Sequence, residues 1–179
     1  MKLKRIVVLS VLLASAVVIG YIESFIPAFF IPGVKLGLAN IVILLCILNF
    51  KWYEALIISI LRCIIVSLIV GTFLNISFLM SISGALFSLI GMEIIVKTKF
   101  KFIVFTSAIG SILHSVGQII MASIIMSTTS IFYYLPFILL LSIPTGLFVG
   151  FVVSKIQKTN VIAKTLNNYE IDEYNNIEN

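Results

Sequence analysis

The sequence predicts an all-α integral membrane protein with six transmembrane helices and both termini in the cytoplasm. Hydrophobic residues make up 61% of the 179 positions and charged residues only 11%, against about 25% charged residues in soluble domains. The mean hydropathy is +1.23. Residues 63–92 and 102–154 contain no Asp, Glu, Lys or Arg, and the second stretch can hold two spans of about 20 residues. This composition excludes soluble enzymes, disulfide scaffolds and free-standing nucleic-acid-binding proteins.

Dividing the apolar stretches at charged residues, Pro and Gly gives the individual spans. The second candidate is short for a hydrocarbon core of about 30 Å, so it must thin the bilayer, lean on its neighbours or stop partway. Trp52 and Tyr53 after it are typical of an anchor at the membrane interface. The six expected spans are residues 6–22, 36–50, 54–70, 78–96, 102–127 and 131–154.

The basic residues predict the orientation, because cytoplasmic loops carry an excess of Lys and Arg. In a six-span topology, ten of the twelve basic residues fall on one side, which we expect to be the cytoplasmic side of the cell membrane. The exceptions are Lys35, in the first outer loop, and Arg62, within the third span. The ten are Lys2, Lys4, Arg5, Lys51, Lys97, Lys99, Lys101, Lys155, Lys158 and Lys164.

The chain divides into a transmembrane domain, residues 1–158, and a C-terminal tail, residues 159–179. The tail is rich in Asn and contains Glu170, Asp172, Glu173 and Glu178. Polar, acidic segments of this kind bury too little apolar surface to fold. We therefore expect a disordered cytoplasmic tail.

Small residues recur at helical spacing in two spans. In the first span, Ser10 with Ala14 and Ala16 with Gly20 form small-xxx-small pairs, which serve either internal packing or docking of another membrane subunit. The fourth span has a stripe of five small residues that allows close approach of a helix or faces a substrate. These five residues are Ser77, Ser81, Gly84, Ser88 and Gly91.

Ionisable and amide side chains within apolar spans are costly unless they are paired, so they mark helix contacts or ligand sites. His114 and Gln118 lie one i, i+4 step apart on the fifth span. Arg62 costs about 2.5 to 3.5 kcal/mol at mid-membrane. Either it forms an ion pair with Glu93, or it is the floor of a pocket for an anionic or polar ligand.

Lys35 and Asn40 flank the start of the second span. Lys35 could snorkel to the surface and Asn40 could cap the helix, or the two could form the rim of an outward-facing site. Ordered by depth, Lys35, Asn40, Gln118, His114 and Arg62 could define one pocket open to the outside. Whether they converge depends on helix packing.

The sequence lacks the residues that several kinds of chemistry require. The only Asp in the chain is Asp172, so there is no aspartate-rich cluster to hold magnesium against a diphosphate. There is no phosphate-binding loop of the ATPase type, and the presence of a single His argues against a metal site. We expect no catalytic residues, no metal and no cofactor, and any energy source must come from a partner.

Several motifs together resemble the Gx transporter family, also labelled heptaprenyl diphosphate synthase component I. The resemblance covers roughly residues 6–154, and the run from Pro32 to Asn40 is its most specific part. The other matching positions are Arg62 and Gly71, with the stripe from Ser81 to Ser88. The motifs are Tyr21-Ile22-Glu23-Ser24 leading to Pro27, Ile31-Pro32-Gly33-Val34-Lys35-Leu36-Gly37-Leu38-Ala39-Asn40, His114-Ser115-Val116-Gly117-Gln118 and Leu135-Pro136.

The resemblance implies a six-helix fold similar to the S components of energy-coupling-factor vitamin transporters. Such a subunit binds its ligand from outside and docks through small residues of its first helix, here Ser10, Ala14, Ala16 and Gly20, onto a transmembrane coupling subunit driven by two ATPase subunits. The enzyme label implies a second role, as an accessory subunit of a polyprenyl diphosphate synthase with a soluble catalytic partner.

The leading hypothesis is therefore a membrane-embedded substrate-binding subunit for uptake of a small vitamin-like or isoprenoid/quinone-precursor molecule. Its predicted pocket residues are Lys35, Asn40, Arg62, His114 and Gln118. The alternative is a non-catalytic membrane subunit of a heptaprenyl or polyprenyl diphosphate synthase. A third possibility is a small membrane scaffold without a ligand. Besides the protein partners named above, we expect the chain to contact the lipid bilayer and to bind a small molecule. We expect no nucleic-acid partner.

Overall fold

The computed structural model describes residues 2–25, 35–98, 102–159 and 162. These residues form α-helices and one 3-10 helix and contain no strand, which confirms the all-α prediction. The elements are α1 (Lys2–Ser24), α2 (Asn40–Asn49), α3 (Trp52–Val70), α4 (Ile76–Lys97), α5 (Ile103–Ile125), η1 (Ser130–Tyr134) and α6 (Leu135–Lys158).

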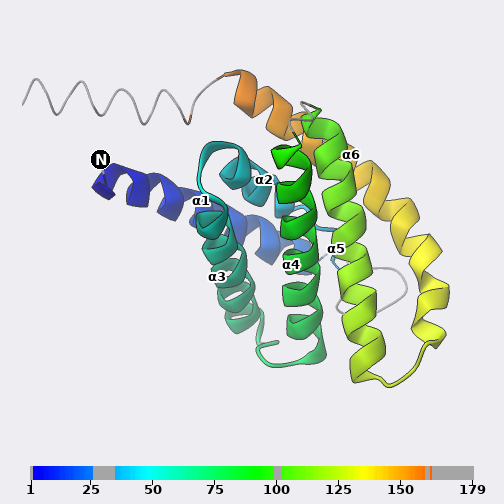
Figure 1. The fold of residues 1–179 in the computed structure, drawn as a ribbon. Helices are drawn as coiled ribbons and strands as arrows, with labels where there is room; N and C mark the ends of the chain where they lie inside the picture. Colours follow the sequence, from blue (N-terminus) through cyan, green and yellow to red (C-terminus); the bar gives the residue numbers. More distant parts are fainter. Residues whose placement is uncertain (1, 26–34, 99–101, 160–161, 163–179) are drawn as a thin grey trace, which may run out of the picture.

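The long helices α3, α4, α5 and α6 stand side by side, and α1 lies across the bundle against α3 (Figure 1). The short helix α2 contacts each of the other five α-helices. Seven of its ten residues are buried, because its sequence is apolar on every side. The centre of the bundle is therefore a short helix, and the pocket described below lies next to its N-terminal end.

Five described helices are long and apolar enough to cross a membrane, as expected of a multi-pass membrane protein. The sixth candidate, α2, has ten residues, which corresponds to about 15 Å, or about half of a hydrocarbon core. The count of six full spans is thus not confirmed. The short second span was expected to thin the bilayer, to lean on its neighbours or to stop partway. In the described structure α2 packs against its neighbours.

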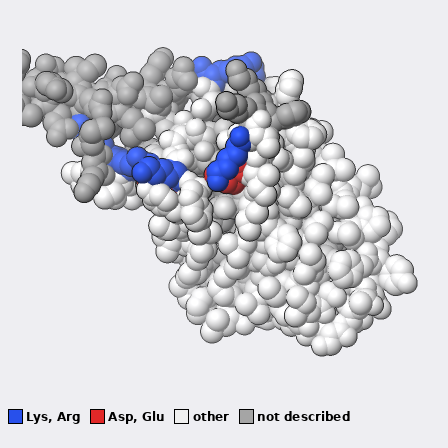
Figure 2. All heavy atoms as spheres, viewed as in Figure 1, with Lys and Arg blue, Asp and Glu red and all other residues white. Residues whose placement is uncertain are grey.

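Charged side chains gather at one end of the bundle. The N-terminal end of α3 and the C-terminal ends of α4 and α6 share this end in Figure 1, where Lys51, Lys97, Lys155 and Lys158 lie. In Figure 2 the visible charges lie toward this end and the rest of the face is uncharged. The grouping agrees with the lysine pattern in the sequence, and the cytoplasmic orientation of this end stays a prediction.

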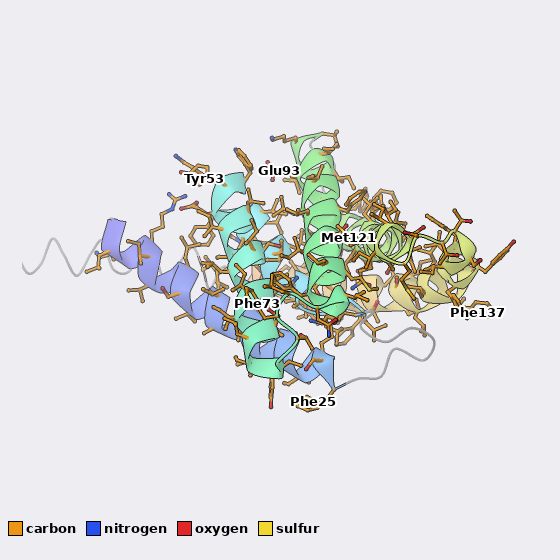
Figure 3. The ribbon with its side chains drawn as sticks, turned by 90° about the horizontal axis from the view of Figure 1, so that it is seen from below. Phe25, Tyr53, Phe73, Glu93, Met121 and Phe137 are labelled. Atoms are coloured by element: carbon orange, nitrogen blue, oxygen red, sulfur yellow. The ribbon has the colours of Figure 1, made fainter. Side chains whose placement is uncertain are left out.

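The outer faces of the helices carry large apolar side chains. Phe25 at the end of α1 points away from the bundle (Figure 3). Because a membrane protein faces lipid rather than water, these side chains are the expected lipid-facing surface. Examples are Val7, Val11 and Val18 on α1, Ile90 and Ile94 on α4, and Leu140, Phe148 and Phe151 on α6.

Helix α5 lies between α4 and α6 at distances that require glycine. A Cβ at Gly84 of α4 would lie 2.8 Å from the backbone oxygen of His114, and a Cβ at Gly150 of α6 would lie 2.5 Å from Cα of Val104. Neither contact leaves room for a methyl group. The stripe of small residues on α4 therefore serves tight packing at Gly84, as one of its two interpretations predicted.

Arg5 and Glu54 join the N-terminal ends of α1 and α3. The guanidinium Nε and Nη2 donate to the two carboxylate oxygens of Glu54 at 2.7 and 2.6 Å. We expect Glu54→Gln to lower the free energy of unfolding by up to about 1 kcal/mol, because the pair is partly exposed. Thermal unfolding in detergent would measure this change, and Arg5→Gln should give the same loss, without further loss in the double variant. Additive losses would contradict a direct pair.

Candidate functional site

The candidate site is a small cavity between α1, α3, α4, α5 and the segment that precedes α2. It has room for about one water molecule. Three of its lining residues, Lys35, Arg62 and His114, belong to the predicted pocket, so the structure brings together polar groups that are far apart in the sequence. The lining residues are Gly20, Glu23, Lys35, Arg62, Cys63, Val66, Ser81 and His114.

Arg62 lies in the middle of α3 and is only 5% exposed. Its Nη2 lies 3.8 Å from Sγ of Cys63, and its Nε has no hydrogen-bond partner in the described structure. No described carboxylate lies within the 4.0 Å of an ion pair. The guanidinium is therefore a buried cation at the cavity that forms no ion pair with a described residue.

The predicted ion pair between Arg62 and Glu93 does not form. Glu93 lies near the lysine-rich end of α4 (Figure 3), where its carboxylate pairs with Lys97 at 3.2 Å. One helical turn separates these two residues, so the pair forms within α4. The other interpretation, Arg62 as part of a pocket wall, agrees with the observed geometry.

His114 and Gln118 lie on the face of α5 that Gly84 allows α4 to approach. With the Gln118 amide oriented to satisfy its hydrogen bonds, its oxygen accepts from His114 Nε2 at 3.2 Å and from the Lys35 backbone N–H at 3.1 Å. Its nitrogen donates to the Lys35 carbonyl at 3.1 Å. Gln118 thus holds the backbone of Lys35 and is not itself a lining residue.

This hydrogen-bond network fixes the proton of a neutral His114 on Nε2. The other ring nitrogen, Nδ1, is buried and has no partner among the described residues. A neutral imidazole with its proton on Nε2 presents Nδ1 as an acceptor. Two residues of the cavity wall thus each have a buried polar atom without a hydrogen-bond partner in the described structure, Arg62 Nε and His114 Nδ1.

Glu23 is the charged lining residue that sequence reasoning did not assign to the site. Its side chain at the end of α1 is buried, and its Oε1 accepts from the backbone N–H of Gly37 and from that of Leu38 at 3.2 Å. Gly37 has φ +83°, a conformation that favours glycine. A lone acid between an apolar span and a segment with a Lys was the pattern that could have identified Glu23.

Asn40 lies beside the site and does not line it. Its Nδ2 donates to Ser88 Oγ at 3.1 Å, while its Oδ1 has no partner in the described structure. The predicted helix cap is wrong, since α2 begins at Asn40 and Ala39 occupies the cap position without a side-chain hydrogen bond. Asn40 instead ties α2 to α4.

The charges around the cavity do not balance. Arg62 and Lys35 are cations and Glu23 is the one lining acid, which gives a net formal charge of +1 when Lys35 is protonated. Burial lowers the pKa of the Lys35 ammonium, Glu23 opposes that shift and Arg62 adds to it. The surroundings thus favour an added negative charge.

The small residues of α1 divide between two environments. Ser10 and Ala14 are exposed, whereas Ala16 and Gly20 are buried. A Cβ on Gly20 would lie 3.1 Å from Cγ2 of Val66, so this end of α1 packs against α3. Docking of a partner through all four residues stays a prediction, with Ser10 and Ala14 as its accessible half.

Part of the motif that carries the resemblance lies outside the described residues. Pro27, Pro32 and Gly33 belong to this part, as does most of the predicted tail. The rest of this run, from Lys35 to Asn40, is described; Lys35 lines the cavity and Asn40 is the first residue of α2.

A comparison with protein families finds a match to the model of heptaprenyl diphosphate synthase component I over residues 12–156. The chain belongs to this family. The match runs from α1 to α6 and includes every residue of the cavity wall. No curated protein and no solved structure matches the chain. The component I family is thus the relationship that is established, and the likeness to S components stays a prediction.

Proposed function

We propose that the chain is the non-catalytic membrane subunit of a heptaprenyl or other polyprenyl diphosphate synthase in the cell membrane. The observation that carries the proposal is the component I match over most of the chain. A name that specifies a component implies another component. In this proposal the partner is a soluble, aspartate-rich subunit that performs the condensation of prenyl diphosphates.

The residues of the chain support this division of labour. Its only Asp is Asp172, and the described residues contain no group of three or more His, Cys, Asp or Glu that could hold a metal. A diphosphate is usually held through magnesium and carboxylates. The proposed subunit therefore supplies a membrane location and a ligand pocket, and the partner supplies the reaction.

The test is affinity purification from native membranes in mild detergent, followed by identification of the bound proteins. We expect stoichiometric recovery of an aspartate-rich soluble synthase, and prenyl-transfer activity only when both proteins are present. Unchanged activity of the soluble protein without the membrane chain, together with no recovery of the pair, would contradict the proposal.

A second candidate function is the substrate-binding subunit of an energy-coupling-factor type transporter. The buried cavity favours it, because an anchoring subunit has no need for an unpaired Arg62 and an unpaired His114 nitrogen inside the membrane. The cargo would be a small vitamin-like or isoprenoid/quinone-precursor molecule. In the same purification, this candidate predicts recovery of a transmembrane coupling protein with two ATPase subunits.

A further inference from the structure

We propose that the cavity binds the carboxylate of a small molecule, with a single negative charge, and does not bind a diphosphate. This inference deepens the proposed function and rests on the cavity being the ligand site of the membrane subunit. It is argued from Arg62, Lys35 and Glu23. The proposed ligand differs in its chemistry from the diphosphate in the family description.

The first step is the charge balance. Glu23 lines the cavity but is held by the N–H groups of Gly37 and Leu38, and it forms no ion pair with Arg62 or Lys35 in the described structure. With Lys35 protonated, one added negative charge makes the site neutral. A diphosphate carries more than one negative charge, and burying an unbalanced charge is costly.

The second step is the shape of the cation. A guanidinium offers two parallel N–H groups that match the two oxygens of a carboxylate. No described oxygen occupies the Nε–Nη2 edge of Arg62, since Nε has no described partner and the contact of Nη2 to the Cys63 sulfur is weak. The site thus has the donor set for one planar oxyanion.

The third step is the size and composition of the wall. The cavity has room for about one water molecule, which is closer to the size of a carboxylate than to that of a diphosphate. The remaining wall is made by Gly20, Val66, Ser81 and His114. None of these side chains is a carboxylate that could hold magnesium against a second phosphate.

Cys63 provides a direct reporter for the cavity. The chain has two cysteines, and Cys46 is buried in the apolar core formed by α2 and its neighbours. A Cys46→Ala background leaves Cys63 as the only thiol, beside Arg62 at 3.8 Å. Because Cys63 is buried, its alkylation by N-ethylmaleimide requires opening of the bundle, and an anion bound in the cavity slows that opening.

The experiment compares sodium propionate, sodium pyrophosphate with and without Mg²⁺, and sodium chloride, at equal ionic strength. We expect propionate to slow alkylation at least threefold relative to chloride and to raise the thermal unfolding midpoint, whereas pyrophosphate does neither. The effect should disappear in Arg62→Gln and weaken in Arg62→Lys, which keeps the charge but loses the planar pair of donors. Arg5→Gln, distant in sequence and paired with Glu54, should keep full protection.

Stronger protection by pyrophosphate than by propionate would overturn the assignment, as would equal protection in wild type and in both Arg62 variants. Absence of any change by either anion, in alkylation rate and in unfolding midpoint, would also overturn it. Because the purified membrane chain is used alone, these outcomes do not depend on a synthase partner. Failure here and failure of the partner purification are therefore distinguishable.

Discussion

Replacing Gly150 by leucine should lower the free energy of unfolding by about 3 kcal/mol, near the upper end of the usual cost of overpacking. A Cβ at this position would lie 2.5 Å from Cα of Val104 and 2.9 Å from Cβ of Ser107. The first obstacle is backbone, which no rotamer change can remove, so α6 must move away from α5. The loss can be measured by denaturant titration of the protein in detergent micelles.

Gly150→Ala should give a smaller loss, of about 1 kcal/mol or more, because it adds only the Cβ. Leu147→Phe is the matched control on the same helix. It also adds volume, but Leu147 is 45% exposed on the outer face, so we expect a change within about 0.5 kcal/mol. Wild-type stability of Gly150→Leu would mean that α5 and α6 do not approach as closely as described.

Replacing Glu23 by alanine should destabilise the protein by about 3 kcal/mol. The change leaves the N–H groups of Gly37 and Leu38 without their acceptor, and each hydrogen bond to a charged group contributes about 1.5 to 3 kcal/mol. It also leaves Arg62 and Lys35 in the cavity without the one acid that lines it. The first effect acts on the segment that leads into α2, and the second acts on the cavity wall.

Glu23→Gln separates these two effects, because the amide oxygen can still accept from the two N–H groups while the charge is lost. We therefore expect its stability to lie between those of wild type and Glu23→Ala, in the same denaturant titration. Glu93→Gln serves as a control for losing an acid. In the described structure Glu93 pairs with Lys97 one turn away, so its loss should cost under about 1 kcal/mol. Equal stability of Glu23→Ala and Glu93→Gln would refute the role assigned to Glu23.

The long helices were predictable because membrane spans follow from hydrophobic length alone. The expected spans 54–70 and 78–96 lie within α3 and α4. The ends of α2 were less predictable, because Leu36 and Leu38 are apolar but the backbone before Asn40 is not helical. Gly37, with φ +83°, and the hydrogen bonds to Glu23 hold that segment in another conformation.

The basic residues of the site could be predicted from the sequence, but the acid that lies near them could not. Arg62, Lys35 and His114 stand out in apolar surroundings, and the described structure brings them to one cavity. Helical spacing does not reveal which acid faces which base, since this depends on helix rotation and crossing. For this reason Glu93 was considered as the partner of Arg62, and Glu23 was not.

The short length of α2 has a consequence for how the protein enters the bilayer during synthesis. Its ten residues are about half of what an independent membrane span needs, and its buried face makes contact with helices that emerge both before and after it. Nascent α2 is too short to span the hydrocarbon core and partition into lipid by itself. We expect it to enter the membrane together with α3, as a helical hairpin, and to reach its final place only when α4, α5 and α6 have closed around it.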